Sequence, residues 1–164
     1  ERALKENPKS SDLHNNMAIV KLGMKDNREA IHSFRMALSL NPNDRNAAAN
    51  VGALYLQNKD YRKALLVMEL ATGSADDKRA LMNYAVALVA NKNYDKAEGI
   101  YKSLMKNSPS DKNIMFNYSI LLIDHLGKNK EGLDLVSKIK FLGPSSEIES
   151  KISALENKAK TGLK

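Results

Sequence analysis

The chain has 164 residues, of which 26 are basic and 19 acidic, and it contains neither cysteine nor tryptophan. Without cysteine it can form no disulfide and no thiolate metal site, and it has no cysteine nucleophile. Its lysines are scattered among acidic residues, which is typical of solvated helix faces, and no apolar run approaches the roughly 18 residues of a membrane span.

A short apolar pattern recurs every 33 to 35 residues. Each copy has a small residue, a large residue four positions later and an apolar residue seven positions later. This period is typical of helix-turn-helix arrays, in which each unit is too small to bury its own apolar face and must stack on its neighbours. The copies begin at Ala30, Ala64, Ala97 and Gly132.

Residues 1–10 are predicted to be the tail of a preceding truncated repeat, because Pro8 and Pro42 are 34 residues apart. The chain begins inside this repeat with Glu1 rather than with methionine, so we expect it to be a piece of a longer protein. A signal peptide or lipid anchor, if present, would then lie upstream.

Four repeats are predicted to follow, each with a first helix (A) and a second helix (B). Proline ends three of the B helices, and Asn or Asp caps the helix that follows. The predicted boundaries are 11–44 for repeat 1, 45–76 for repeat 2, 77–110 for repeat 3 and 111–144 for a divergent repeat 4.

Two of these repeats depart from the pattern. Repeat 2 lacks the proline, and we expect Gly73 to end its B helix in a left-handed conformation, with Asp76 or Asp77 capping the next helix. Repeat 4 has one extra residue, which we place in its internal turn around residues 126–128. Its B helix is then predicted at about residues 130–141.

Residues 145–164 are predicted to form a capping helix. Ser146 and Glu149 fit a capping box, with the serine as N-cap and the glutamate at N3. An amphipathic helix at this point would shield the exposed end of the array. Its apolar stripe consists of Ile148, Ile152, Leu155 and Ala159.

The pattern resembles the tetratricopeptide repeat (TPR), whose A helix carries a large residue, Leu-Gly and Tyr, and whose B helix carries Ala, an aromatic, Ala and Pro. The resemblance covers about residues 1–144, with His14 and Ala48 at the usual tryptophan position. Repeats 2 and 3 carry it most clearly, through Val51, Gly52, Tyr55, Ala64, Ala71, Tyr84, Ala85, Leu88, Tyr94, Ala97, Tyr101 and Pro109.

The resemblance implies an all-α, right-handed superhelical solenoid whose concave wall consists mainly of the A helices. Small residues on the two helices of each repeat are expected to let them approach closely. These are Ala18, Gly52, Ala85 and Ser119 on the A helices, facing Ala30, Ala64, Ala97 and Gly132 on the B helices.

Alignment of the repeats places asparagine at the sixth position of every A helix. An amide side chain both donates and accepts hydrogen bonds, so a column of them can pair with the backbone of an extended ligand. Family members that hold extended peptides use such a ladder, by resemblance; the alternative is that each amide bonds within its own repeat. The four residues are Asn16, Asn50, Asn83 and Asn117.

A second row lies three residues further along each A helix and is aliphatic throughout. Residues at i and i+3 share a helix face, so this row should lie beside the asparagines; the alternative is that it packs between helices. The row is Ile19, Ala53, Val86 and Ile120, supplemented by Met82, Phe116 and the cation Arg79.

The sequence therefore predicts a non-enzymatic scaffold that binds an extended or helical segment of another protein in the concave groove. The alternative is an assembly subunit of a larger complex, for example in bacterial secretion, the envelope or motility, which makes contact through the repeat ends and the capping helix. A net charge of +7 is also compatible with an acidic partner surface.

No catalytic residue, metal site or cofactor is predicted. His14, His32 and His125 are dispersed without metal-ligand spacing, and no phosphate-binding glycine loop is present. An asparagine-plus-aliphatic wall also argues against a nucleic-acid partner. The sequence leaves the compartment open, because cytoplasm and bacterial periplasm are both compatible with it.

Overall fold

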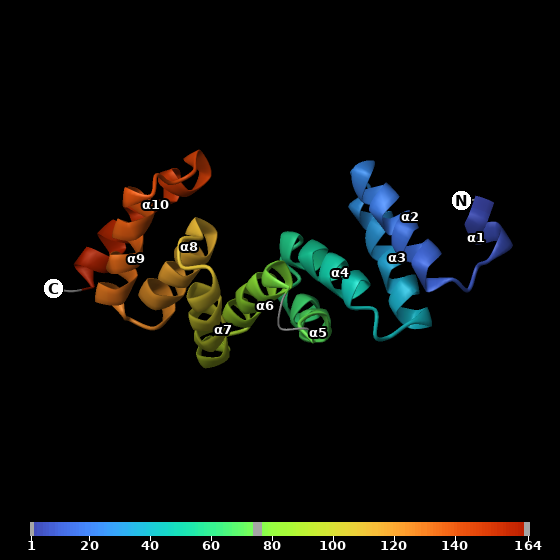
Figure 1. Ribbon diagram of the computed structural model, residues 1–164, viewed down its shortest axis with the longest axis horizontal. Helices are drawn as coiled ribbons and strands as arrows, with labels where there is room; N and C mark the ends of the chain where they lie inside the picture. The colour runs from blue at the N-terminus through green and yellow to red at the C-terminus, as the bar shows by residue number, and fades with distance from the viewer. Residues whose placement is uncertain (1, 74–76, 163–164) are drawn as a thin grey trace. The chain divides into compact units, whose positions relative to one another are not determined.

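The structure is a computed structural model that describes residues 2–73 and 77–162 (Figure 1). Every regular element within these ranges is a helix. The chain divides into two compact bodies, an N-terminal body of residues 1–87 and a C-terminal body of residues 88–164. The division falls inside helix α6 (Lys78–Ala90).

The N-terminal body contains a short first helix, two helix pairs and the start of α6. Its other helices are α1 (Arg2–Glu6), α2 (Ser11–Gly23), α3 (Asn27–Leu40), α4 (Arg45–Gln57) and α5 (Tyr61–Ala71). α2 packs on α3, α4 packs on α5, and α3 also contacts α4. Each pair therefore buries its apolar face partly against its neighbour in the chain.

The C-terminal body continues from the end of α6. Its elements are α7 (Tyr94–Asn107), α8 (Lys112–Ile120), the π-helical turn η1 (Leu121–His125), α9 (Asn129–Phe141) and α10 (Ser146–Thr161). α8 packs on both α7 and α9, and α10 contacts α9 and η1. The final helix thus covers the end of the last helix pair, as expected of a capping helix.

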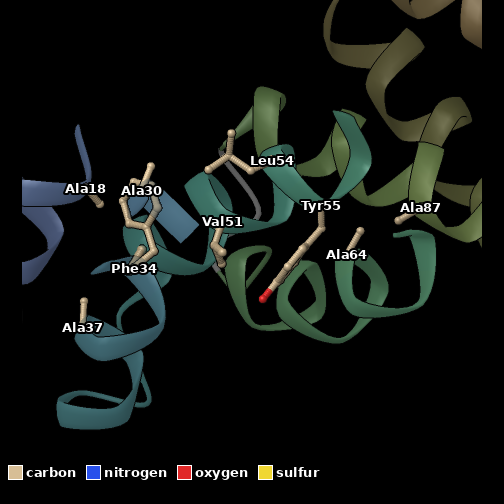
Figure 2. Close-up of a cluster of buried hydrophobic side chains, with 10 residues drawn as sticks. Ala18, Ala30, Phe34, Ala37, Val51, Leu54, Tyr55, Ala64 and Ala87 are labelled. Atoms are coloured by element: carbon tan, nitrogen blue, oxygen red, sulfur yellow. The ribbon is translucent and has the colours of Figure 1, made fainter. Parts of the chain in front are cut away.

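Small side chains dominate the core of the N-terminal body (Figure 2). Ala18, Ala30 and Ala64 are completely buried. A Cβ atom added at Gly52 would lie 2.5 Å from Cε of Met68, so a larger residue on α4 would require the Met68 side chain of α5 to shift. The positions expected to allow close helix approach are therefore occupied by buried small residues.

The stripe on α10 is buried as a unit. Its four side chains are at most 7% exposed, so this helix packs through the face that its 3.6-residue periodicity indicates. At Gly132 on α9 an added Cβ atom would collide with the side chain of Ile123. The buried stripe residues are Ile148, Ile152, Leu155 and Ala159.

Aspartate side chains begin many of the helices. Asp26, Asp44 and Asp60 each accept a hydrogen bond from the backbone N–H three residues further on. A carboxylate there satisfies an N–H that lacks a helical partner and interacts favourably with the helix dipole. Asp77 caps α6 in the same way, whereas Asp76, the other predicted cap, lies outside the described residues.

The structure corrects two of the predicted helix ends. Gly73 does not adopt a left-handed conformation; instead its N–H donates to the carbonyl of Leu70, so a tightened last turn ends α5. Helix α10 begins one residue earlier than the capping box requires, because Ser145 is the N-cap and the N–H of Glu149 donates to its carbonyl. Ser146 is already helical, and Ser145 makes no side-chain cap bond.

The turns between paired helices share one backbone conformation. Lys25, Lys59 and Lys92 have positive φ angles of 61°, 60° and 64°. In the second of these turns, Lys59 N–H donates to Leu56 and Asp60 N–H donates to Tyr55, the two bonds of a Schellman motif. The left-handed conformation costs a non-glycine residue about 1–2 kcal/mol, so these turns are strained.

The extra residue of repeat 4 lies in the helix rather than in the turn, which corrects the prediction. η1 widens the helix, since Leu126 N–H donates to the carbonyl of Leu121, five residues earlier. The following turn keeps the shared conformation, because Gly127 has φ 67° and occupies the place of the lysines. α9 consequently begins at Asn129, one residue before the predicted start.

Replacing Lys25, Lys59 and Lys92 by glycine should raise the free energy of unfolding by about 0.5 kcal/mol per site. The left-handed strain that is removed exceeds the roughly 0.4–1 kcal/mol by which glycine favours the unfolded chain. Urea denaturation measures the change. Arg35→Gly, at an exposed position in the middle of α3, is the control and should cost about 1 kcal/mol. A triple variant less stable than the original chain would contradict the strain argument.

Candidate protein-binding surface

Helix α4 has one accessible strip that runs along its length, beside the exposed Arg45 and the half-buried Leu56 near its two ends. Its neighbours α3 and α5 bury most of the helix, including Val51 and Tyr55. The residues that remain at least partly accessible along one face follow helical spacing, at i, i+4, i+7 and i+11. This strip consists of Asn46, Asn50, Ala53 and Gln57. Both predicted binding residues of this helix, Asn50 and Ala53, therefore lie on it.

The corresponding strip on α2 is more apolar than the sequence alignment indicated. Asn16 is exposed, and 49% of Ile19 is accessible. Val20 and Met24, which the alignment did not select, are 57% and 67% exposed. The sequence could have indicated their exposure, because α2 carries apolar residues on more than one face. A helix that packs through a single face needs apolar residues on that face only.

On α6 the predicted residues are less accessible. Arg79 is exposed, while Met82, Asn83 and Val86 are half-buried. All four belong to the N-terminal body, as do the strips on α2 and α4. The N-terminal body thus carries eight of the eleven predicted binding residues: Asn16, Ile19, Asn50, Ala53, Arg79, Met82, Asn83 and Val86.

The asparagines of the N-terminal body keep their amide groups available. The side chains of Asn16, Asn50 and Asn83 make no hydrogen bond to any other residue in the described part of the chain. Asn117, in the C-terminal body, differs because its Nδ2 donates to the carbonyl of Asn113 at 2.9 Å. The within-repeat interpretation therefore holds at Asn117, while the ligand-binding interpretation stays a prediction for the other three asparagines.

The remaining predicted residues, Phe116 and Ile120, border a pocket in the C-terminal body. Phe116 is only 8% exposed and Ile120 is half-buried. The pocket has a volume of about 240 Å³ and lies between α8–η1 and α10. Its other wall consists of four residues of α10 that the sequence analysis did not select as binding residues: Lys151, Ala154, Leu155 and Lys158. Their i, i+3, i+4, i+7 spacing could have indicated that these four residues share one face of α10.

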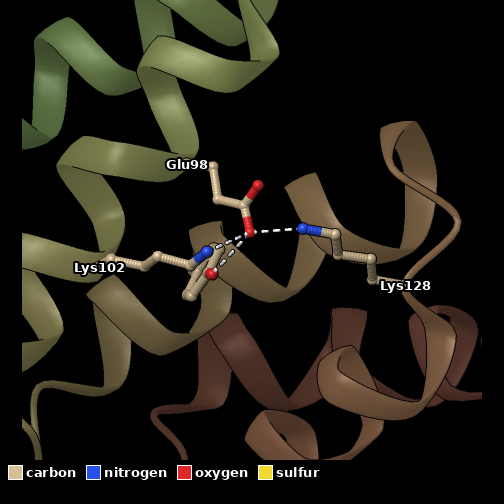
Figure 3. A network of polar contacts seen from close by, with 4 residues as sticks. Glu98, Lys102 and Lys128 are labelled. Atoms are coloured by element: carbon tan, nitrogen blue, oxygen red, sulfur yellow. Dashed lines mark hydrogen bonds and ion pairs between the residues drawn. The ribbon is translucent and has the colours of Figure 1, made fainter.

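One carboxylate in the C-terminal body, that of Glu98, bonds to neighbouring side chains of the same body. Glu98 Oε1 accepts from Lys128 at 2.7 Å and pairs with Lys102 at 2.9 Å, and the hydroxyl of Tyr118 donates to it at 3.3 Å (Figure 3). The ammonium groups of Lys128 and Lys102 lower the pKa of Glu98 from 4.5 to about 2. Burial, aided by the negative charge of Glu98, raises the pKa of Tyr118. This network ties α7 to α8 and to the start of α9.

The histidines do not converge. Nε2 of His14 lies 2.9 Å from the carbonyl oxygen of Pro8, and His125 stacks on Tyr94 with ring centroids 4.8 Å apart. No cluster of three potential metal ligands occurs among the described residues. Within the same residues, no helix combines the length and the hydropathy needed to cross a membrane.

Two family models, both described as "Tetratricopeptide repeat", match the chain over residues 15–78 and 55–115. The chain therefore belongs to the tetratricopeptide-repeat family, and the predicted fold class, an all-α solenoid of such repeats, is confirmed. The fold supports a protein-interaction scaffold in general. No curated protein sequence matches the chain.

Solved structures share this fold at low sequence identity. MamA (residues 41 to the end) from Desulfovibrio magneticus RS-1 is 16% identical with a TM-score of 0.76, over 93% of this chain and 89% of that one. YrrB, described as a TPR protein with an unusual peptide-binding site, is 18% identical with a TM-score of 0.75, over 98% and 90%. The pilF protein of Pseudomonas aeruginosa is 16% identical with a TM-score of 0.71, over 98% and 76%.

Glu98→Gln should lower the free energy of unfolding at pH 7 by about 1 kcal/mol, because it removes the charge of a mostly buried carboxylate that pairs with two partly exposed lysines. The pKa of Glu98 is lower in the folded chain, so its contribution is present above about pH 4.5 and disappears as the pH falls towards 2. The deficit of the variant should therefore shrink over that range in urea titrations. Glu149→Gln, at an exposed position, is the control; a deficit that is independent of pH would contradict the assignment.

Proposed function

We propose that this chain is a non-enzymatic scaffold that binds an extended or helical segment of another protein along the accessible strips of α2 and α4 and the less accessible predicted residues of α6. The observation that carries the proposal is the surface of α4. On a helix that its neighbours otherwise bury, an unbonded asparagine, Asn50, lies one turn from an exposed alanine, Ala53. That combination provides a hydrogen-bonding group beside an apolar one.

The two rows suit different parts of a bound segment. An asparagine amide can donate to a peptide carbonyl and accept from a peptide N–H, so Asn16, Asn50 and Asn83 would hold the partner backbone whatever its sequence. Ile19 and Ala53 would contact its apolar side chains. Ile19 and its neighbours on α2 are accessible apolar groups, and contiguous surfaces of this kind mark interaction sites.

Membership of the family supports a protein partner. The likeness to YrrB supports only the fold, although it means that a protein described as having a peptide-binding site shares the architecture. The proposed repeat boundaries, 11–44, 45–76, 77–110 and 111–144, would place one asparagine of the row in every repeat.

Site-specific photocrosslinking tests the proposal. With benzoylphenylalanine in place of Ala53, the full chain should crosslink to one protein from a lysate of the source organism. The triple variant Asn16→Ala, Asn50→Ala, Asn83→Ala should abolish that crosslink, because it removes the amide contacts to the partner backbone. Asn157→Ala, at an exposed position of α10, is the matched control and should retain the crosslink. Probe placement at Leu66, which is 71% exposed on α5, controls for adventitious apolar contact.

Equal crosslinking from positions 53 and 66 would contradict the proposed surface. Retention of the crosslink in the triple asparagine variant, with its helicity unchanged, would contradict the role of the amides.

One observation favours the alternative of an assembly subunit that makes contact through its repeat ends. Phe141 is 90% exposed and Leu142 is 41% exposed at the end of α9. Under the scaffold proposal, Phe141→Ser should leave partner capture unchanged and alter stability by less than about 0.5 kcal/mol, because the side chain is exposed. Quantitative pull-down and thermal melting measure both effects. Loss of capture with stability unchanged would favour the assembly alternative.

A further inference from the structure

We propose that the pocket between α8–η1 and α10 is a second docking site, which receives one bulky apolar side chain from an acidic segment of a partner protein. It differs from the uncovered strips of the N-terminal body, because all of its lining residues belong to the C-terminal body. The inference rests on the proposed function only in taking the partner to be a protein.

The interior of the pocket is apolar and large enough for such a side chain. Phe116 and Ile120 line it from α8, and Ala154 and Leu155 line it from α10. Its volume is about 240 Å³, whereas an apolar cavity of about 150 Å³ already accommodates benzene. A phenylalanine or leucine side chain therefore fits, and its burial would supply the attraction.

The pocket is formed before any ligand binds. α10 is fixed by its buried stripe, and two ion pairs join it to the elements below: Lys158 with Asp124 at 2.7 Å, and Lys140 with Glu156. Nζ of Lys112 also donates to the carbonyl of Gly143, in the loop before α10, at 2.7 Å. A preformed apolar concavity with a few polar groups at its edge is the usual form of a binding pocket.

Charge at the edge of the pocket selects an acidic partner. Of the three charged lining residues, Lys151 and Lys158 are cationic and Asp124 is anionic, so the lining carries a net positive charge. Lys158 forms an ion pair with Asp124. Among the residues that the structure describes, Lys151 pairs only with Glu147, whose side chain is 83% exposed. An exposed i, i+4 pair of this kind contributes little, so the ammonium group of Lys151 can exchange it for a partner carboxylate.

The same charges disfavour a second copy of this chain as the occupant. Phe141 is the most exposed large apolar side chain among the described residues. However, Lys138 lies three residues before it and would bring like charge to a lysine-edged pocket. A partner with acidic residues around its apolar side chain avoids this repulsion.

Binding of a defined peptide to the full chain tests the proposal. The probe is a fluorescein-labelled Asp-Glu-Phe-Asp-Glu peptide, followed by anisotropy. Ala154→Trp, which fills the pocket from an exposed position, should weaken binding about tenfold or more. Ser153→Trp, on the adjacent exposed residue outside the lining, is the matched control and should bind as the original chain does.

Two further measurements separate the contribution of charge to peptide binding from that of the apolar side chain. Lys151→Glu, an exposed charge reversal, should weaken the peptide about threefold or more at low salt, and a peptide with serine in place of phenylalanine should bind about tenfold more weakly. The Asn50→Ala and Asn83→Ala variants should leave peptide binding unchanged. Failure of the strip proposal can thus be distinguished from failure of the pocket proposal.

Undiminished binding to the Ala154→Trp variant would overturn the proposal, as would equal binding of a Lys-Lys-Phe-Lys-Lys peptide. Sedimentation gives the remaining outcome. Self-association that Ala154→Trp abolishes would assign the pocket to a second copy and would overturn the acidic segment as its occupant.

Discussion

The close approach of paired helices at small residues is the constraint on which the rest of this structure depends. An added Cβ atom would collide at Gly52 with Met68, and at Gly132 with Ile123. Alanine and glycine bury little apolar surface, so a single pair cannot stabilise itself and must pack on the next. Packing on both sides buries most of α4 and leaves one accessible strip along its length, with only Arg45 and Leu56 of this helix accessible beside it. The surface available to a partner is therefore what remains after repeat packing has been satisfied.

Helix positions followed from the sequence because period, small residues and capping aspartates all point to the same boundaries. Helix α3, for example, extends from Asn27 to Leu40, follows the capping Asp26 and carries Ala30, the small residue of the first copy of the pattern. Prediction failed where adjacent local signals compete. Ser145 and Ser146 are chemically equivalent as N-caps, and only the backbone path shows that the first of them precedes the helix. The π-helical turn η1 was also not predicted, because no residue pattern distinguishes a hydrogen bond to the fifth preceding residue from one to the fourth.

Prediction of the surface was limited because accessibility depends on neighbours distant in the sequence. The same alignment position is exposed at Asn16 and hydrogen-bonded within its helix at Asn117. Phe116 was selected as a groove residue, but it is mostly buried beside a pocket that α10 completes. Its helix partner Leu155 was recognised only as part of an apolar stripe. The asparagine and aliphatic rows were readable from the sequence, whereas their division between open strips and a walled pocket was not.

The π-helical turn η1 has a consequence for how such repeats change in length. An α-helix advances about 100° per residue, so one inserted residue would rotate everything beyond it out of register. Here the wider turn absorbs the residue, and Gly127 still adopts the left-handed conformation found at Lys25, Lys59 and Lys92. The same turn contains Asp124, which pairs with Lys158 of α10. An inserted residue in this array can thus be accommodated by a local π-helical turn, without a longer loop. The widened turn can then carry a side chain that makes a new contact, as Asp124 does.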